Sequence, residues 1–353
     1  MKIFTRMLVA FVITLIAAVV FFNSTVSSTS AANWPQWRGP EGQGVSGETG
    51  LPVEWSATKN IKWKTAIAGR GHSSPIVWGN KIFLTTALDG DLIPGAKAGV
   101  THKLLDGTEF VHPDAVGADR KHTFKVICLD KETGKIVWER VAYEGPVGDS
   151  RHKKASFASS TPATDGKYVF AFFGTEGLYA YDYKGKLVWK QSLGTLGTAS
   201  VGYGVSPILY KNVVIMQCDD SGGKSFIAAF HKKTGKQAWR TERKVDLTWS
   251  SPVLVRVGNR TELVASAAEA IIAYDPETGK ELWRHKGLDS NAVTTPVVSN
   301  DLVLITSGYP KKIALALKAG GSGDVTGTSR LVWSYNRARH TFLLQSSMAT
   351  IFI

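Results

Sequence analysis

The chain has little cysteine, no long apolar run beyond its first residues, and fewer acidic than basic side chains. Only Cys128 and Cys218 occur among 353 residues, and they lie ninety positions apart. A disulfide framework is therefore excluded, and both cysteines read as core residues. With 43% hydrophobic and 20% charged residues, the composition is that of an ordinary globular protein. It excludes wholesale disorder and a protein with many membrane spans.

Basic residues outnumber acidic ones. Lys and Arg total 42 against 29 Asp and Glu, which gives a net charge of +13. Such a surplus favours an acidic partner, such as an anionic polymer or a membrane surface. A soluble domain with Lys-rich turns has the same composition, and this simpler explanation stays open.

Residues 1–32 have the pattern of an export signal. Lys2 and Arg6 begin it, the apolar run Met7–Phe22 follows, and small residues end it at Ala31-Ala32. The run of 16 residues is short for a membrane span of about 20, so cleavage and an uncleaved anchor through residues 7–22 both stay open. No Cys follows the run, so a lipoprotein anchor is not indicated. In either case we expect a periplasmic or other extracytoplasmic protein, which argues against a nucleic-acid partner.

From residue 73 onward the sequence repeats itself at intervals of about 45 residues. Each of five units opens with Ser-Pro or Thr-Pro and closes with a Trp, and four units have a Gly four positions before the Trp. The openings are Ser74-Pro75, Thr161-Pro162, Ser206-Pro207, Ser251-Pro252 and Thr295-Pro296. The closing residues are Trp138, Trp189, Trp239, Trp283 and Trp333, and the glycines are Gly134, Gly185, Gly235 and Gly279.

This recurring pattern of Ser/Thr-Pro, Gly and Trp predicts about four antiparallel strands per unit. Pro suits the first position of a strand because it donates no backbone hydrogen bond. Runs such as Lys167–Phe173 predict buried or half-buried strands, and the Gly supplies the positive φ of a tight hairpin. A small residue nine or ten positions before each Trp, such as Ala229 before Trp239, leaves room for the indole. We therefore predict an all-β β-propeller of four-stranded blades, each Trp filling the gap to the next blade.

The pattern Ala-x-Asp-x-x-Thr-Gly-x-x-x-Trp resembles the tryptophan-docking repeat of the pyrroloquinoline quinone (PQQ)-like propellers. That superfamily includes the quinoprotein alcohol dehydrogenases and the outer-membrane-protein assembly scaffold. Residues 33–40 and 320–326 resemble its exported bacterial branch. The resemblance covers residues 33–336 and implies the fold but no particular activity. It also implies closure with about seven or eight blades. Residues 337–353 lack Gly, Pro and the repeat, so we predict an atypical tail from truncation or a frameshift, and an incomplete ring.

Two internal segments depart from the repeat. An insertion in the first unit, about Ala87–His122, holds His102, His112 and His122 at spacings of ten and ten. A metal site from these histidines and a carboxylate is one interpretation. A solvated loop over one end of the ring is the other, and it is favoured because the spacing matches no compact ligand motif. The connector 143–160 carries a basic patch at 149–154, which we expect to be a solvated turn or an anion-binding site.

Candidate catalytic residues are few. A quinoprotein dehydrogenase needs PQQ, a divalent ion and a carboxylate base, and the resemblance implies an adjacent Cys-Cys pair that this sequence lacks. Asp219 and Asp220 are the paired carboxylates near a strand end, and they are candidates for a calcium site and a base. A plain turn is the alternative for them. His72 is a candidate acid or base, and Arg70 a candidate cofactor-binding residue.

Two functions follow from this sequence. The favoured one is an exported, non-catalytic binding or scaffold module that takes a protein or an anionic polymer at its rim. Exposed hydrophobic side chains on the first-unit insertion would support it. The alternative is a PQQ- and calcium-dependent alcohol dehydrogenase. A non-functional remnant of a truncated gene is the third interpretation.

Overall fold

The computed structural model describes residues 33–308 and 310–336. The export signal predicted at 1–32 and the atypical tail predicted at 337–353 lie outside the described residues. In the described part of the chain, no helix is long and apolar enough to cross a membrane. The helical structure found there is one 3-10 turn, η1 (Gly174–Glu176).

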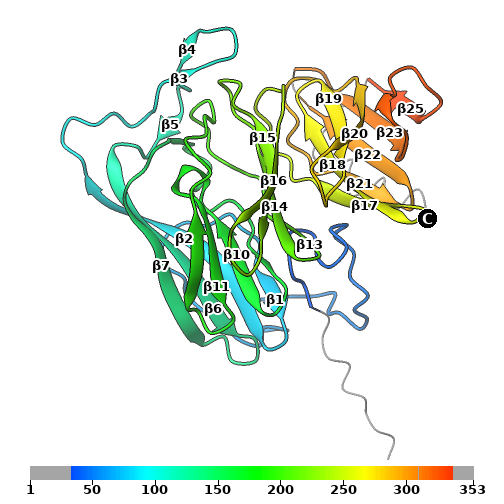
Figure 1. The fold of residues 1–353 in the computed structure, drawn as a ribbon. Coiled ribbons are helices and arrows are strands. Elements are labelled where there is room, and N and C mark those ends of the chain that lie inside the picture. The colour runs from blue at the N-terminus through cyan, green and yellow to red at the C-terminus, as the bar shows by residue number, and fades with distance from the viewer. Residues whose placement is uncertain (1–32, 309, 337–353) are drawn as a thin grey trace, which may run out of the picture. The chain divides into compact units, whose positions relative to one another are not determined.

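Five separate sheets form, one from each predicted repeat unit (Figure 1). We number these sheets as blades 1–5 in chain order; each begins at a Ser/Thr-Pro strand and contains a Trp strand. Blade 1 contains β1 (Ile76–Trp78), β2 (Lys81–Leu92), β6 (Arg120–Asp130) and β7 (Ile136–Pro146). Blade 2 contains β9 (Ala163–Thr164), β10 (Tyr168–Phe172), β11 (Leu178–Asp182) and β12 (Leu187–Gln191). Blade 3 contains β13 (Ile208–Tyr210), β14 (Val213–Cys218), β15 (Phe226–His231) and β16 (Gln237–Glu242).

Blades 4 and 5 complete the described fold, and the blade 5 segment contributes one short strand to the sheet of blade 4. Blade 4 contains β17 (Val253–Val257), β18 (Arg260–Ala267), β19 (Ala270–Tyr274) and β20 (Glu281–Lys286). Blade 5 contains β21 (Val297–Ser299), β22 (Leu302–Ser307), β23 (Ile313–Lys318) and β25 (Leu331–Tyr335). β24 (Gly323–Asp324), which lies between β23 and β25 in the chain, pairs in parallel with β20 of blade 4. The prediction of an all-β fold with four-stranded antiparallel blades is confirmed.

The hydrophobic core lies between neighbouring blades. One cluster joins Phe83 and Trp138 of blade 1 to Tyr181 of blade 2, and three further clusters join blades 2 and 3, 3 and 4, and 4 and 5. Both cysteines are buried and unpaired, and burial raises the pKa of the Cys128 thiol to about 11. Blades 2, 3 and 4 each have two apolar faces, and the adjacent blades cover them.

The hydroxyls of three Ser/Thr-Pro openings link consecutive blades. The amide of Ser74 donates to the hydroxyl of Thr161 at 2.9 Å, and the amide of Thr161 donates to the hydroxyl of Ser206 at 3.0 Å. The amide of Ser206 continues the series to Ser251 at 2.9 Å. These hydroxyls are buried, so a residue without one would leave an amide with no partner. The sequence analysis explained the Pro of this motif and missed the role of the Ser or Thr.

Each Trp at the first three junctions lies on the turn glycine of the next blade. Trp138 faces Gly185, Trp189 faces Gly235 and Trp239 faces Gly279, and a β-carbon on any of these glycines would lie closer than 3.0 Å to the indole. The small residue predicted to precede each Trp lies directly opposite it on the neighbouring strand. These contacts restrict the turn position under each indole, which we call the seat of the Trp, to glycine.

Two hydrogen bonds accompany the ring contact. The Trp189 indole donates to the Lys232 carbonyl at 2.8 Å, and the residue two positions later, Gln191, donates to the Gly235 carbonyl at 2.9 Å. Trp239 and the residue two positions after it make the same pair of bonds to the turn of blade 4, at 3.1 and 2.7 Å. The side chain two positions after Trp138 also donates to its turn glycine, at 2.7 Å.

Trp63 occupies an equivalent seat that the sequence analysis missed. Its ring faces Gly134 of blade 1, and its indole donates to the Lys131 carbonyl at 2.8 Å. Thr65, two positions later, donates to the Gly134 carbonyl at 2.6 Å. The segment Trp-Lys-Thr at 63–65 parallels Trp-Arg-Thr at 239–241, and this similarity is the signal that could have identified it.

The seat of Trp283 differs from the others, which corrects the expectation of equivalent seats. The fifth unit has no Gly four positions before its Trp. The Trp283 indole donates instead to the carboxylate of Glu262 at 2.7 Å. The Gly320 amide of blade 5 donates to the same oxygen at 3.0 Å, and Arg260 donates to the other oxygen at 2.8 Å. Trp333 lies opposite Ala316 on the neighbouring strand.

The insertion in blade 1 is shorter than predicted. β2 runs on to Leu92 and β6 starts at Arg120, so both ends of the predicted segment 87–122 are paired strand. The part that leaves the blade is 93–119, and Figure 1 shows it projecting beyond the ends of the blade strands. It contains the hairpin of β3 (His102–Lys103) and β4 (Glu109–Phe110), and then β5 (Ala115–Val116), which pairs with β8 (Arg151–His152).

An N-terminal segment reaches across several blades. Trp34 pairs with Val77 of β1, and the Trp37 indole donates to the hydroxyl of Thr295 at the start of blade 5, at 3.1 Å. Residues of this segment also line a small pocket with the inner strands of blades 3 and 4. This segment therefore connects the first blade directly to the fifth.

Candidate functional site

Asp219, a candidate base and calcium ligand, is part of a buried ion pair. Its Oδ1 lies 2.8 Å from Nε of Arg243, and both side chains are fully buried. Its Oδ2 accepts hydrogen bonds from Thr248 and from Gln217, the latter at 2.7 Å. Burial raises the pKa of the Asp219 carboxyl, while Arg243 and these hydrogen bonds act in the opposite direction. Oδ2 of Asp219 is thus taken up by protein donors and Oδ1 faces the Arg243 cation, an arrangement that does not fit a calcium ligand.

Asp220, its neighbour, caps a turn. Its Oδ1 accepts the amides of Gly222 and Lys224 at 2.8 and 3.2 Å, and its Oδ2 accepts the amide of Gly197. Three backbone donors around one carboxylate match the plain-turn alternative better than a calcium site. The two carboxylates therefore do not form the calcium site that a bound PQQ requires, and we derive no step through PQQ or calcium.

His72 and Arg70 lie on the exposed approach to β1. Both side chains are exposed, and the Arg70 guanidinium donates to the Lys153 carbonyl at 3.3 Å. The Arg70 backbone pairs with Ala87 of β2. Neither residue contacts Asp219 or Asp220, so the predicted candidates do not converge on one site.

The three histidines of the insertion do not meet either. His102 bonds to Asp149 through Nε2 at 2.8 Å. His122 is buried, bonds to the Gly117 carbonyl at 2.7 Å, and has a pKa lowered by burial. His112 lies instead beside His152 of β8, with ring centroids 5.2 Å apart.

His112, Asp114 and His152 form a cluster whose possible ligand atoms lie within 4.8 Å of one another. Nδ1 of His112 accepts the Asp114 amide, and Nδ1 of His152 accepts the Lys154 amide, both at 3.1 Å. Nε2 of each neutral ring therefore carries the proton, and Lys153 Nζ lies 2.8 Å from the Asp114 carboxylate. A metal needs the Nε2 lone pairs, so these contacts fit a hydrogen-bonded cluster and not a metal site.

The segment 149–154, for which a solvated turn and an anion-binding site are the two predictions, is exposed only in part: Lys153 and Lys154 are exposed, and the first three residues are buried. Asp149, Ser150 and Arg151 are 3%, 0% and 5% exposed. They are buried because β8, which contains Arg151, pairs with β5 of the insertion. The insertion therefore covers this connector, and the connector holds the insertion in place.

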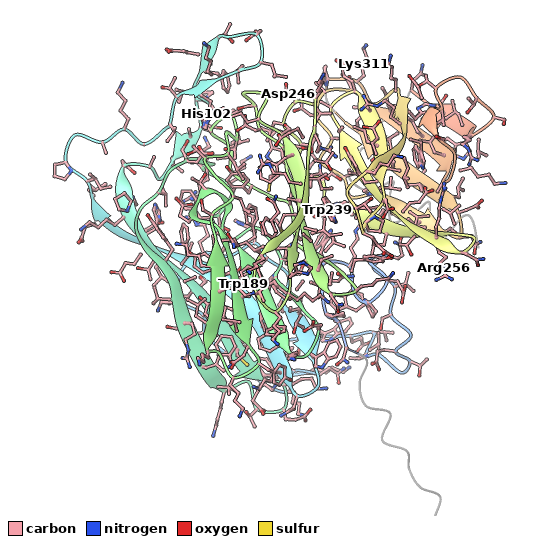
Figure 2. The ribbon with its side chains drawn as sticks, viewed as in Figure 1. His102, Trp189, Trp239, Asp246, Arg256 and Lys311 are labelled. Carbon is pink, nitrogen blue, oxygen red and sulfur yellow. The ribbon has the colours of Figure 1, made fainter. Side chains whose placement is uncertain are left out.

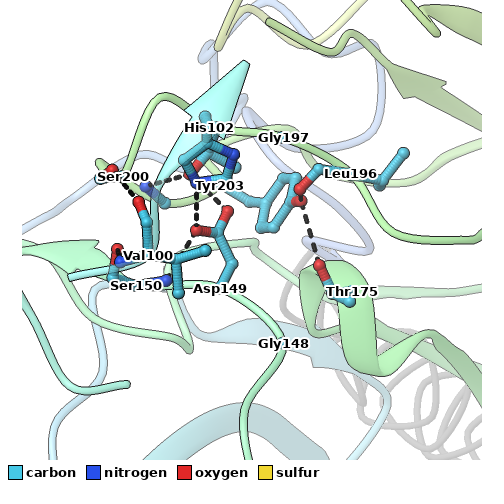
Figure 3. Close-up of polar contacts among 12 residues, drawn as sticks. Val100, His102, Gly148, Asp149, Ser150, Thr175, Leu196, Gly197, Ser200 and Tyr203 are labelled. Atoms are coloured by element: carbon cyan, nitrogen blue, oxygen red, sulfur yellow. Dashed lines mark hydrogen bonds and ion pairs between the residues drawn. The ribbon is translucent and has the colours of Figure 1, made fainter. Parts of the chain in front are cut away.

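A buried polar network anchors the insertion to blades 2 and 3 (Figure 3). The Asp149 carboxylate accepts hydrogen bonds from His102, from the Thr198 hydroxyl at 2.6 Å and from the Ser150 amide at 2.6 Å. A second link runs from the Ser200 hydroxyl to the Val100 carbonyl at 2.7 Å. A satisfied buried network rigidifies its segment, so the hairpin is held in one position.

A cavity of about 640 Å³ lies between this hairpin and the turn that follows β14. His102, Leu105, Asp220 and Ser221 are among its lining residues. A second pocket of about 490 Å³ shares Leu105 with it and extends to Asp246. Figure 2 shows His102 and Asp246 on the same side of the described structure, away from Trp189.

Apolar side chains are exposed on the insertion, as the binding-module hypothesis requires. Leu105 and Val111 are 56% and 43% exposed, and Leu92, at the end of β2 where the insertion begins, is 63% exposed. The hairpin that carries Leu105 is fixed by the network below it, so these side chains have a defined position. Exposed apolar groups on an ordered loop are typical of an interaction surface.

Comparison with known proteins places the chain in a family. The family described as outer membrane protein assembly factor BamB matches residues 115–225 and 223–351. The protein is 21% identical over 266 residues to the outer membrane protein assembly factor BamB of Moranella endobia (strain PCIT). That alignment covers 70% of this chain and 62% of the relative, so the chain spans less than two thirds of the relative's length.

Solved structures agree on the fold. A europium-containing methanol dehydrogenase superposes with a TM-score of 0.53 at 14% identity, over 88% of this chain and 59% of that chain. BamB from Moraxella catarrhalis gives a TM-score of 0.44 at 15% identity, over 78% and 76% of the two chains. At 14% identity, the similarity to the methanol dehydrogenase shows a shared fold alone. The family match covers more than half of the sequence, and the chain belongs to the BamB family of PQQ-like repeat propellers.

Proposed function

We propose that this protein is an exported, non-catalytic scaffold that binds protein partners through the blade 1 insertion. The observation that carries the proposal is the raised hairpin itself, which exposes Leu105 while His102 and Asp149 fix its base. An anchored loop loses little conformational freedom when a partner docks, so its exposed apolar area contributes more to affinity.

Membership of the BamB family supports a role in assembly. The relative from Moranella endobia is named an outer membrane protein assembly factor, and we infer the same class of role, in the periplasm, for this chain. The net charge of +13 would also suit an anionic polymer. We favour a protein because Asp106, Asp220, Asp246 and Glu269 line the two insertion pockets.

The predicted catalytic residues support a non-catalytic role. Asp219 is neutralised by Arg243, and Asp220 is held by backbone amides. A general base must reach a substrate proton, and neither carboxylate is free to do so.

Site-specific photo-crosslinking in cells tests the proposal. A photoreactive residue replaces Leu105 in one variant and the comparably exposed Leu187 of β12 in the control; these residues are 56% and 49% exposed. We expect discrete adducts with envelope proteins from position 105 and far fewer from position 187. We also expect the intact chain to restore outer-membrane protein levels in a strain that lacks its own BamB.

The enzymatic alternative has its own measurement. Purified protein is incubated with PQQ and calcium and assayed for dye reduction with a series of alcohols. Turnover that Asp219→Asn abolishes, together with equal crosslinking at positions 105 and 187, would replace the scaffold by a dehydrogenase.

A further inference from the structure

The cavity beneath the hairpin gathers three polar atoms around one point. The atoms are His102 Nδ1, Ser221 Oγ and Asp220 Oδ2. They lie 3.1, 2.9 and 3.2 Å from the position that a β-carbon on Gly197 would have. That point is one bond length from the Gly197 Cα and cannot itself hold a ligand atom, but because Gly197 has no side chain there, a ligand group in the cavity can approach all three atoms. His102, Asp220 and Ser221 come from two segments that only the docked insertion brings together.

All three atoms can accept a hydrogen bond. Asp149 accepts from His102 Nε2, which therefore carries the ring proton and leaves a lone pair on Nδ1. Asp220 is held by amide donors as a carboxylate and contributes a negative charge.

Ser221 is the most informative member of the group. Its side chain is 2% exposed, lines the cavity, and has no hydrogen-bond partner for Oγ among the described residues. A buried hydroxyl without a partner is rare in folded proteins, because burial without a hydrogen bond is unfavourable. The Ser221 hydroxyl is therefore a group that a ligand would satisfy.

From these contacts we infer that the cavity binds a primary ammonium group, presented by a lysine side chain on an extended segment of a protein partner. An ammonium group has three donors and one positive charge, which match three acceptors and one carboxylate. The flat guanidinium of arginine directs its donors in one plane and fits three acceptors around a point less well. This inference rests on the proposed function and names the chemistry of the partner.

The wider charge distribution around the cavity supports a cationic ligand. Asp106, Asp246 and Glu269 line this cavity or the pocket that adjoins it. Burial raises the pKa of Asp246, and the negative charges of Asp220, Asp106 and Glu269 add to this effect. Lys103, Lys224 and Lys244 also line these two pockets and are exposed, as Asp106 and Glu269 are. Solvent therefore screens these charges of both signs, and the buried carboxylate of Asp220 is screened least.

The test is a titration of the full chain with a fluorescent pentapeptide that has one central lysine between glycines. We expect saturable binding, seen as a rise in fluorescence anisotropy. The same peptide with acetyl-lysine or norleucine should bind at least about tenfold more weakly, a change of about 1.4 kcal/mol. Both replacements keep the chain length and remove the charge, so equal binding of all three peptides would overturn the inference.

Two variants locate the binding event. Gly197→Ala places a methyl group at the point between the three acceptors and should weaken binding about tenfold or more. Ser221→Ala removes one acceptor and should weaken it about fivefold. Ser266→Ala is the matched control, because Ser266 is also buried with no partner for Oγ among the described residues but lies outside the cavity. Its affinity should equal that of the wild type.

The outcomes separate this inference from the scaffold proposal. If Gly197→Ala and Ser221→Ala melt normally and bind the lysine peptide as the wild type does, the cavity is not the ammonium site. The same holds if calcium displaces the peptide, because a metal then occupies the acceptors. Crosslinking at position 105 that persists in either case would leave the scaffold proposal standing.

Discussion

The first three blade junctions and the fourth seat the same side chain by different means. At the junctions that Trp138, Trp189 and Trp239 fill, the indole lies on a glycine of the next blade. At the fourth junction Trp283 is 1% exposed, and its N–H bonds to the buried carboxylate of Glu262. Both arrangements bury the indole between two blades.

The difference shows which contacts the repeated turn supplies to the Trp of the preceding blade. A Thr-Gly turn provides a surface without a β-carbon, a carbonyl for Trp239 and a second carbonyl for Thr241. Blade 5 has no Gly four positions before Trp333. Glu262 provides the acceptor for Trp283 and also receives the Gly320 amide. His285, two positions after Trp283, is buried with no hydrogen-bond partner for either ring nitrogen among the described residues. The fourth junction therefore depends on one charged side chain where the others depend on backbone.

Removing the ring from a regular junction should have the largest effect. Trp189→Ala deletes an indole that is 8% exposed and packs between blades 2 and 3. We expect the free energy of unfolding to fall by about 3–5 kcal/mol. Urea denaturation followed by circular dichroism measures this change.

Val188→Ala is the control for that variant, because Val188 is the sequence neighbour of Trp189 and is 39% exposed. We expect it to change stability by less than about 0.5–1 kcal/mol. Equal losses for the two variants would show that the indole does not hold the junction together.

Removing the carboxylate from the fourth junction should be the next largest change. Glu262→Ala leaves the Trp283 indole and the Gly320 amide without an acceptor in a buried site. We expect a loss of about 2–4 kcal/mol in the free energy of unfolding. Glu262→Gln keeps one carbonyl oxygen and should lose clearly less. A Gln variant as unstable as the Ala variant would mean that the charge, and not the acceptor, is what Trp283 needs.

Filling a glycine seat tests the ring contact alone. Gly235 and Gly258 both have positive φ, +70° and +58°, but a β-carbon meets the Trp189 ring at Gly235 and nothing within 4 Å at Gly258. Both Ala variants therefore share the cost of the left-handed backbone. We expect Gly235→Ala to be less stable than Gly258→Ala by a further 1–2 kcal/mol, roughly, from overpacking. Equal melting temperatures would contradict a seat formed by ring contact.

Much of the fold could be predicted because residues with strict backbone requirements recur in the sequence. Pro75, Gly134 and Trp138 occupy positions where few other residues fit, so their spacing is visible in one sequence. The side chain two positions after each Trp is not visible in this way. Arg140, Gln191 and Thr241 make the same hydrogen bond to a glycine carbonyl although their chemistry differs. A shared role without a shared residue type leaves no repeat signal.

The candidate site could not be predicted because it depends on how the insertion docks. His102 and Asp149 are 47 positions apart and belong to no motif, and the pairing of β5 with β8 brings them together. The basic composition of 149–154 suggested solvent exposure, whereas Asp149 and Arg151 are buried under the insertion. The plain turn given as the alternative for Asp219 and Asp220 does describe Asp220, whose donors Gly222 and Lys224 follow it closely. The partner of Asp219, Arg243, lies too far along the chain to be inferred.

The smallest expected effect concerns His285, and it distinguishes the fourth junction by pH. Burial lowers the pKa of His285 below its usual value of 6.5. Below pH 6.5 the unfolded chain therefore binds a proton that the folded chain does not, so stability should fall as the pH drops from about 6.5 towards the folded-state pKa. His285→Phe removes this titrating side chain, and the free energy of unfolding of the variant should decline less than that of the wild type between pH 7.5 and 5.

His231→Phe is the control, because His231 is exposed at the end of β15, and its stability curve should follow that of the wild type. Thr241, the equivalent residue of the third junction, has a carbonyl to bond and no charge to gain. Parallel curves for the wild type and His285→Phe would therefore mean that His285 finds a partner for its proton, and that the fourth junction is as well satisfied as the third.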